Sequence, residues 1–186
     1  SELRIGHCSS EKLHFTFERI EDSLRIFLVN ADESGSMESR LDENIRAFSA
    51  IAGVLGQRAD VVILHGFASD SHYDVFASKT ARERLGDPAL LIEEGKGTAY
   101  FVRDAAAAMA EAAQCLAKHR SRGTTNPRSH AEFLDRLGNR LDQAGIDVEL
   151  IVLNSSDGGF DGGPKSPMTQ AIDRAMRGLN ARCRCL

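Results

Sequence analysis

Three oxygen-bearing side chains occupy alternate positions of one short segment, at Asp32, Ser34 and Ser36. Alternate residues of a curled loop can turn to the same side, and Gly35 between the two serines permits a tight backbone. Carboxylate and hydroxyl oxygens are hard ligands that suit Mg²⁺ and similar ions rather than zinc or copper. The segment therefore predicts a site for a divalent cation.

The same residues have a second interpretation, because Ser and Asp are also the residues that most often precede a helix. An amphipathic helix is expected at 39–57, where Leu41, Ile45 and Phe48 recur at helical spacing. A serine or aspartate just before this helix would serve as its N-cap. Taken alone, the segment is compatible with both interpretations, a cation site and a helix cap.

Runs of apolar residues separated by helical patterns determine the expected fold. Buried strands are expected at 24–29, 60–67 and 147–153, and a half-buried or edge strand is expected at 13–20. Besides 39–57, helices are expected at 79–86, 99–119, 129–144 and 166–180. Continuous apolar strands alternating with helices predict an α/β fold, with a mostly parallel central sheet and helices on both faces.

Polar loops follow two of the expected strands, at 30–37 and 154–163. A third polar loop, at 123–126, lies between the helices expected at 99–119 and 129–144. Binding sites of α/β folds lie at the carboxyl ends of the strands. The side chains of these loops can therefore converge at one edge of the sheet.

The segment Asp32-x-Ser34-Gly35-Ser36 after an apolar strand, with Asp157-Gly158 after a later strand, resembles the metal-ion-dependent adhesion site of the von Willebrand factor A (VWA) or integrin I-like family. The resemblance covers about residues 24–180. It implies a Rossmann-like VWA fold for residues 1–186 as one domain, with 1–20 as an additional N-terminal segment. The ion implied is Mg²⁺, or Mn²⁺ or Ca²⁺ in its place.

The resemblance also implies a role for each site residue. Ser34, Ser36 and a threonine would give hydroxyl oxygens directly to the ion, and Asp32 and Asp157 would anchor it, often through water. Thr124 is favoured as the threonine, because one helix before its loop and one after it match the family's order. Thr125 and Thr98 are the alternatives.

A site rich in neutral hydroxyls leaves the charge of the cation only partly compensated, so a glutamate or aspartate of a partner protein can complete the coordination. The resemblance thus implies a protein-binding module rather than an enzyme. It would serve either in adhesion outside the cell or as an intracellular adaptor of a AAA+ ATPase, as in chelatase complexes. Cysteines without a disulfide pattern and a start without signal-peptide character favour the cytoplasmic role.

Two enzyme classes are alternatives to this interpretation. The segment 61–67 resembles the oxyanion-loop strand of an α/β-hydrolase, but the sequence has no GxSxG motif for the nucleophile. A core strand that ends in a tight turn explains His65-Gly66 better. A phosphotransfer enzyme would need a P-loop lysine motif or a DxDx(T/V) motif, and neither occurs. A structural α/β domain without a metal is the remaining alternative.

The charge balance of the sequence argues against nucleic acid and anionic membranes as partners. The net charge is −4 and the pI is about 5.9, so no basic surplus indicates binding to nucleic acid or to an anionic membrane. No apolar run is long enough to span a bilayer. Cys8, Cys115, Cys183 and Cys185 have the spacing of neither a disulfide framework nor a CxxC zinc site.

Overall fold

The computed structural model describes residues 23–55, 59–92, 95–118, 123–124, 126–145, 147–155, 167–182 and 184–185. The strand expected at 13–20 and the additional N-terminal segment lie outside these residues. Two of the residues expected in the cation site, Asp157 and the alternative Thr125, also lie outside them.

Among the described residues, a six-stranded sheet forms the centre of the fold, in the order β4-β3-β2-β1-β5-β6. The central strand β1 runs parallel to β2 and β5, and β6 runs parallel to β5. β3 is antiparallel to β2, and β4 is parallel to β3. The strands are β1 (Leu24–Asp32), β2 (Val61–Phe67), β3 (Ser71–Ala77), β4 (Gly97–Phe101), β5 (Val148–Ser155) and β6 (Arg184–Cys185).

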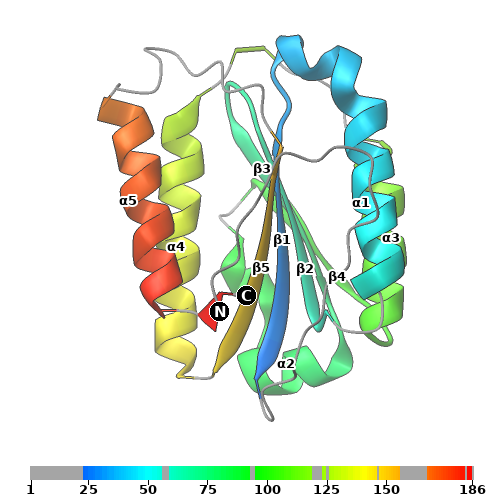
Figure 1. The fold of residues 1–186 in the computed structure, drawn as a ribbon. Helices are drawn as coiled ribbons and strands as arrows, with labels where there is room; N and C mark the ends of the chain where they lie inside the picture. The colour runs from blue at the N-terminus through cyan, green and yellow to red at the C-terminus, as the bar shows by residue number, and fades with distance from the viewer. Residues whose placement is uncertain are drawn as a thin grey trace.

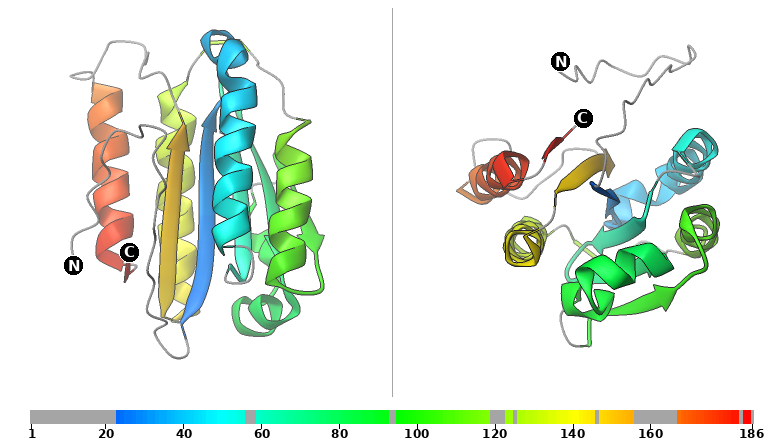
Figure 2. Two further views of the ribbon diagram at one scale, coloured as in Figure 1. Left: turned by 45° about the vertical axis from the view of Figure 1, so that its right-hand side comes forward. Right: turned by 90° about the horizontal axis from the view of Figure 1, so that it is seen from below.

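Helices cover both faces of this sheet, with α1 and α3 on one face and α4 and α5 on the other (Figure 1). Figure 2 shows the same two layers from below, with the sheet between them. The bounds are α1 (Leu41–Leu55), α2 (Lys79–Leu85), α3 (Ala105–Leu116), α4 (Pro127–Ala144), α5 (Pro167–Arg182), and the short 3₁₀ helices η1 (Gly35–Arg40) and η2 (Pro88–Leu91). The expected α/β architecture is confirmed.

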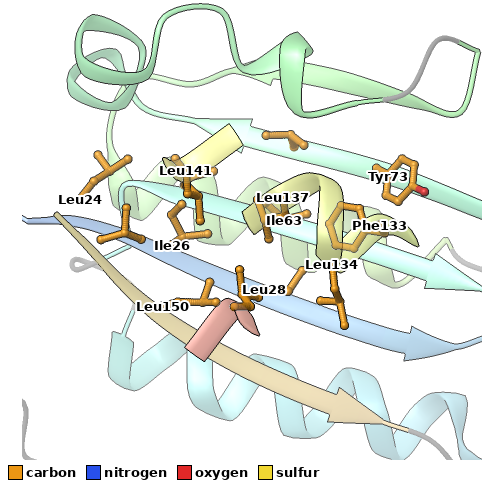
Figure 3. Packing of buried hydrophobic residues seen from close by; sticks show 14 of the residues in the cluster. Leu24, Ile26, Leu28, Ile63, Tyr73, Phe133, Leu134, Leu137, Leu141 and Leu150 are labelled. Carbon is orange, nitrogen blue, oxygen red and sulfur yellow. The ribbon is translucent and has the colours of Figure 1, made fainter. Parts of the chain in front are cut away.

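The core consists of two apolar clusters, one on each face of the sheet, because successive side chains of a strand point to opposite faces. Leu24, Ile26 and Leu28 of β1 pack with Phe133 and Leu137 of α4 (Figure 3). Between them, Phe27 and Val29 point the other way and pack with Phe48 of α1 and Met109 of α3. This double burial explains why the central strands read as continuous apolar runs.

The helix expected at 99–119 is wrong at its beginning, where β4 occupies Gly97–Phe101 and α3 starts only at Ala105. The carboxylate of Asp104 caps α3 by accepting a hydrogen bond from the backbone N–H of Ala107, at 2.9 Å. Tyr100 and Phe101 just before the cap are aromatic residues that favour a strand. The cap therefore separates two elements that the alanine-rich pattern had joined.

A buried ion pair joins β1 to β5 near the amino ends of the two strands. Arg25 and Glu149 are opposite each other in the register, and the Arg25 Nε donates to the Glu149 carboxylate. Glu149 is fully buried. The backbone N–H of Arg25 also donates to the carboxylate of Asp60, at 3.0 Å.

Among the described residues, no helix has the length and apolar character needed to cross a membrane.

Candidate functional site at the carboxyl end of the sheet

The central strand β1 ends at Asp32, where the sheet meets the loop that leads into η1. The Asp32 side chain is buried, and its Oδ1 accepts a hydrogen bond from the backbone N–H of Ser34, at 2.9 Å. The backbone N–H of Glu33 donates to the carbonyl of Phe67 at the end of β2, at 2.8 Å. These bonds fix the start of the loop against the two central strands.

Ser34 occupies the N-cap position of η1, yet its side chain makes no capping hydrogen bond. Its hydroxyl oxygen lies instead 3.1 Å from the hydroxyl oxygen of Ser36. Ser34 is buried, while Ser36 is exposed at the surface. The N-cap interpretation therefore does not account for the Ser34 hydroxyl, and the two serine oxygens form a pair that reaches the protein surface.

The loop that carries Thr124 lies against this serine loop. The backbone N–H of Gly35 donates to the carbonyl of Gly123, at 3.0 Å. The backbone N–H of Thr124 donates to the hydroxyl of Ser69, at 3.1 Å, and that of Asn126 donates to the carbonyl of Ala68, at 2.6 Å. Thr124 is exposed beside the serines. The turn between β2 and β3 thus holds a distant loop next to the first motif.

Gly123 is the glycine that this arrangement requires. Its φ of +63° lies in the left-handed region, and a Cβ at this position would overlap the hydroxyl of Ser69. Gly35, by contrast, is not among the glycines with positive φ, and a Cβ there would meet only the Gly123 carbonyl oxygen, at 3.9 Å. The tight backbone expected at Gly35 is therefore found at Gly123.

The position of Asp157 stays a prediction, but the strand before it leads to the same edge. β5 lies beside β1, with Ser155 opposite Ala31, the neighbour of Asp32. The hydroxyl of Ser155 donates to the side-chain oxygen of Asn44 in α1, at 2.7 Å. In sequence, Asp157 comes two residues after Ser155.

The alternative threonine, Thr98, lies elsewhere. It belongs to β4 and is opposite Asp74 of β3, so that β3 and β2 both lie between it and β1. Neighbouring strands are about 4.8 Å apart, which puts Thr98 roughly 14 Å across the sheet from β1. The structure therefore brings together Asp32, Ser34, Ser36 and the Thr124 loop, and it leaves Thr98 apart.

Glu33 and His72 pack beneath the loop of the first motif, on the side of the sheet. Glu33 is buried, and its carboxylate lies 3.6 Å from His72 Nε2 of β3. The two side chains close over Gly66 of β2, where a Cβ would overlap both of them. A glycine at this point of β2 is thus required by the packing of Glu33 and His72, and the sequence pattern gave no sign of it.

His65 has a structural role in β2. The strand continues through Gly66 to Phe67 and then turns directly into the antiparallel strand β3, as expected for a core strand that ends in a tight turn. The ring is fully buried, with Nδ1 3.0 Å from the Asn30 side-chain oxygen and Nε2 3.2 Å from the Ser71 hydroxyl. It stacks on Phe133, with ring centroids 4.2 Å apart. Both nitrogens are thereby used inside the core.

The donor chemistry of the described residues fits a hard cation. Within the described ranges, no group of three or more His, Cys, Asp and Glu side chains has an arrangement that could hold a metal ion. The described oxygen donors at this edge of the sheet include the hydroxyls of Ser34, Ser36 and Thr124 and the carboxylate of Asp32. Such a mixed set suits Mg²⁺, which takes oxygen ligands and retains several waters.

Comparison with known proteins identifies the fold. No protein-family model matches the sequence, and no curated protein is similar to it in sequence. The structure is similar to the solved structure of von Willebrand factor type A from Catenulispora acidiphila, with a TM-score of 0.51 and 14% identity over 88% of this chain and 32% of that one. The chain therefore has a VWA-like α/β fold, and it spans about a third of the length of that protein.

A looser similarity is found to the pilus adhesin SpaC from Lactobacillus rhamnosus GG in its open conformation. The TM-score is 0.37, with 22% identity over 76% of this chain and 15% of that one.

Proposed function

We propose that this protein is a divalent-cation-dependent protein-binding module, in which a bound Mg²⁺ ion coordinates an acidic side chain of a partner. The observation that carries the proposal is the Ser34 hydroxyl. It sits at the start of a helix but turns to Ser36, 3.1 Å away, instead of capping the helix. The loop of Thr124 is bonded to the residue between these two serines.

In this proposal Ser34, Ser36 and Thr124 hold the ion through neutral hydroxyl oxygens, and Asp32 and Asp157 supply negative charge. The bound ion would supply an incompletely neutralised positive charge with an exchangeable position, which a carboxylate of the partner can fill. The exposure of Ser36 and Thr124 supports this, because both lie where a partner can approach. One acidic residue would then determine orientation and specificity.

The cellular role belongs to the same proposal. We place the module in the cytoplasm as an adaptor that does not catalyse a reaction itself, working with a AAA+ ATPase as in chelatase-like complexes. The sequence order of a first helix, a buried strand ending in Gly66-Phe67, a long insertion and the Thr124 loop supports this choice. The insertion contains β3, α2, η2, β4 and α3.

Thermal unfolding with and without Mg²⁺ or Mn²⁺ tests the cation site. A ligand at about a hundred times its Kd stabilises the native state by about 2.7 kcal/mol, so the wild type should show a clear rise in Tm. Ser34→Ala should lose this rise. Ser39→Ala is the matched control, because Ser39 is an exposed serine of the same 3₁₀ helix, and it should keep the rise. No cation-dependent shift in the wild type would contradict the proposal.

The choice of threonine is tested by comparing Thr124→Ala with Thr98→Ala. The first substitution is expected to weaken Mg²⁺ binding by about tenfold or more, equivalent to about 1.4 kcal/mol, because a direct ligand is lost. The second should leave the affinity unchanged, since Thr98 lies in β4. Isothermal titration calorimetry measures both affinities. The opposite pattern would assign the role to Thr98 and contradict the geometry described above.

A further inference from the structure

The strand β4 forms one edge of the sheet and is unusually apolar for that position. Among the described residues, the large hydrophobic side chains that are exposed are Tyr100 and Phe101, both in β4, with 39% and 57% of their surface accessible. Edge strands are normally protected from pairing by lysine, proline or a bulge. The sequence Gly97-Thr98-Ala99-Tyr100-Phe101 contains neither lysine nor proline.

The backbone groups of alternate residues in β4 face away from the sheet. The N–H of Tyr73 in β3 donates to the carbonyl of Lys96, at 2.8 Å, and the N–H of Val102 donates to the carbonyl of Ala77, at 3.1 Å. Because a parallel ladder uses every second residue of each strand, Thr98 and Tyr100 complete the bonds to β3. The N–H and C=O groups of Gly97, Ala99 and Phe101 therefore point outward, along the edge of β4 that pairs with no other described strand.

The two exposed aromatic rings are held in place on opposite faces of the strand. The Tyr100 ring stacks on Phe76 of β3, with centroids 4.6 Å apart and planes inclined by 7°. The Arg82 guanidinium of α2 lies 4.8 Å from the centre of the Phe101 ring. Rings positioned in this way lose little conformational freedom when another strand packs beside them.

We propose that a second copy of this chain pairs with β4 in the antiparallel direction, about a twofold axis at Ala99, to form a homodimer with a continuous sheet. In this register the outward-facing residues exchange hydrogen bonds: Ala99 pairs with Ala99 of the second copy, and Gly97 pairs with Phe101. Thr98 is then opposite Tyr100.

The pattern of side-chain sizes favours a second copy in this register. Tyr100 of one strand is opposite the β-branched Thr98 of the other, a combination that stabilises cross-strand pairs. Phe101 is opposite Gly97, a position where an aromatic ring can cover the glycine. No charged residues oppose each other within Gly97–Phe101. A parallel arrangement would place Phe101 beside Phe101 and would lack this match.

The dimer has a consequence for the cation sites. Antiparallel pairing of β4 reverses the direction of every strand in the second copy, so the carboxyl ends of the two β1 strands point to opposite ends of the continuous sheet. The two candidate sites would face away from each other. The dimer could then hold two partner molecules on opposite sides, although the pairing itself does not depend on the proposed cation binding.

Sedimentation equilibrium of the full chain tests the proposal. The wild type should be a dimer that dissociates on dilution. Phe101→Lys should be a monomer, as should Ala99→Pro, which removes an outward N–H without affecting the bonds to β3. Ala47→Lys, at an exposed position of α1, is the matched control and should remain a dimer. A cooperative thermal transition in each variant shows that it is folded.

A disulfide at the twofold axis tests the register. The Cα atoms of a hydrogen-bonded antiparallel pair are about 5.5 Å apart, within the range that a disulfide spans. In a chain with its four cysteines replaced by serine, Ala99→Cys should form a covalent dimer under mild oxidation, and Ala47→Cys should not. A wild type that stays monomeric at its highest soluble concentration would overturn the proposal, as would a dimer unaffected by Phe101→Lys and Ala99→Pro.

Discussion

Replacement of Glu149 by alanine is expected to lower the free energy of unfolding by about 3–5 kcal/mol, because it leaves the charge of the buried Arg25 without its partner. Glu149 is fully buried and accepts from the Nε of Arg25, opposite it on the neighbouring strand. The pair joins β1 to β5, the two strands whose carboxyl ends lead to Asp32 and Asp157. Equilibrium unfolding in urea measures the effect.

The double substitution Arg25→Met/Glu149→Leu serves as the control for Glu149→Ala. Removing both charges and keeping the volume should restore most of the stability, since a buried ion pair adds little over apolar residues of similar size. A loss below about 1 kcal/mol in Glu149→Ala would be the value of a surface ion pair and would contradict the burial of this one.

Phe133→Ala is expected to have a loss of similar size, about 3–5 kcal/mol, because it removes a large ring from a packed core. Phe133 of α4 stacks on His65, at 4.2 Å between centroids, and on Tyr73, at 4.6 Å. The Tyr73 hydroxyl also accepts a hydrogen bond from Arg136 Nη2 of α4, at 2.9 Å. The stacked rings of Phe133, His65 and Tyr73 thus attach α4 to β2 and β3.

Phe133→Leu should cost less than about 1.5 kcal/mol, since most of the apolar volume stays in place. Urea unfolding of the two variants, monitored by circular dichroism, gives the difference. Equal losses in Phe133→Ala and Phe133→Leu would show that the aromatic stack, rather than the filled volume, determines the stability at this position.

The central strands could be predicted from the sequence because they are buried on both faces. β1 and β2 are buried at every residue, so most of their side chains are apolar and the runs at 24–29 and 60–67 stand out. The run at 147–153 identifies β5, which is buried at Val148, Glu149 and Leu150 and half-buried at 151–153. Helix α4 could be predicted from the apolar face formed by Phe133, Leu137 and Leu141.

β3 and β4 could not be predicted, because tertiary contacts compensate their polar or exposed residues. The Ser71 hydroxyl is hydrogen-bonded to His65 Nε2, and Asp74 accepts a hydrogen bond from the thiol of Cys115 in α3, at 3.3 Å. These partners are distant in sequence or on another element, so the polar residues of β3 resemble a turn. β4 is an edge strand with little buried surface, and the alanine-rich sequence after it hides its end.

The first motif of the candidate site could be predicted from the sequence. The contacts that hold the Thr124 loop beside this motif could not. The side chains at Asp32, Ser34 and Ser36 follow from a local pattern. The contact of Gly123 with Gly35 and Ser69 depends on how the β2–β3 turn meets a loop from the other half of the chain. A contact between segments so far apart in sequence leaves no local pattern. The only related feature of the sequence is Gly123, the glycine directly before Thr124.

The central claim is that a cation bound to the protein coordinates a partner's carboxylate. The relaxation of acetate methyl protons by Mn²⁺ bound to the protein tests this claim most directly. Acetate represents the acidic side chain of a partner, and a carboxylate on the paramagnetic ion should relax much faster with the wild type than with free Mn²⁺ at the same concentration. Ser34→Ala should abolish this enhancement, and Ser39→Ala should retain it. Equal relaxation with the wild type and with Ser34→Ala would contradict a cation site at Ser34 that is open to a partner's carboxylate.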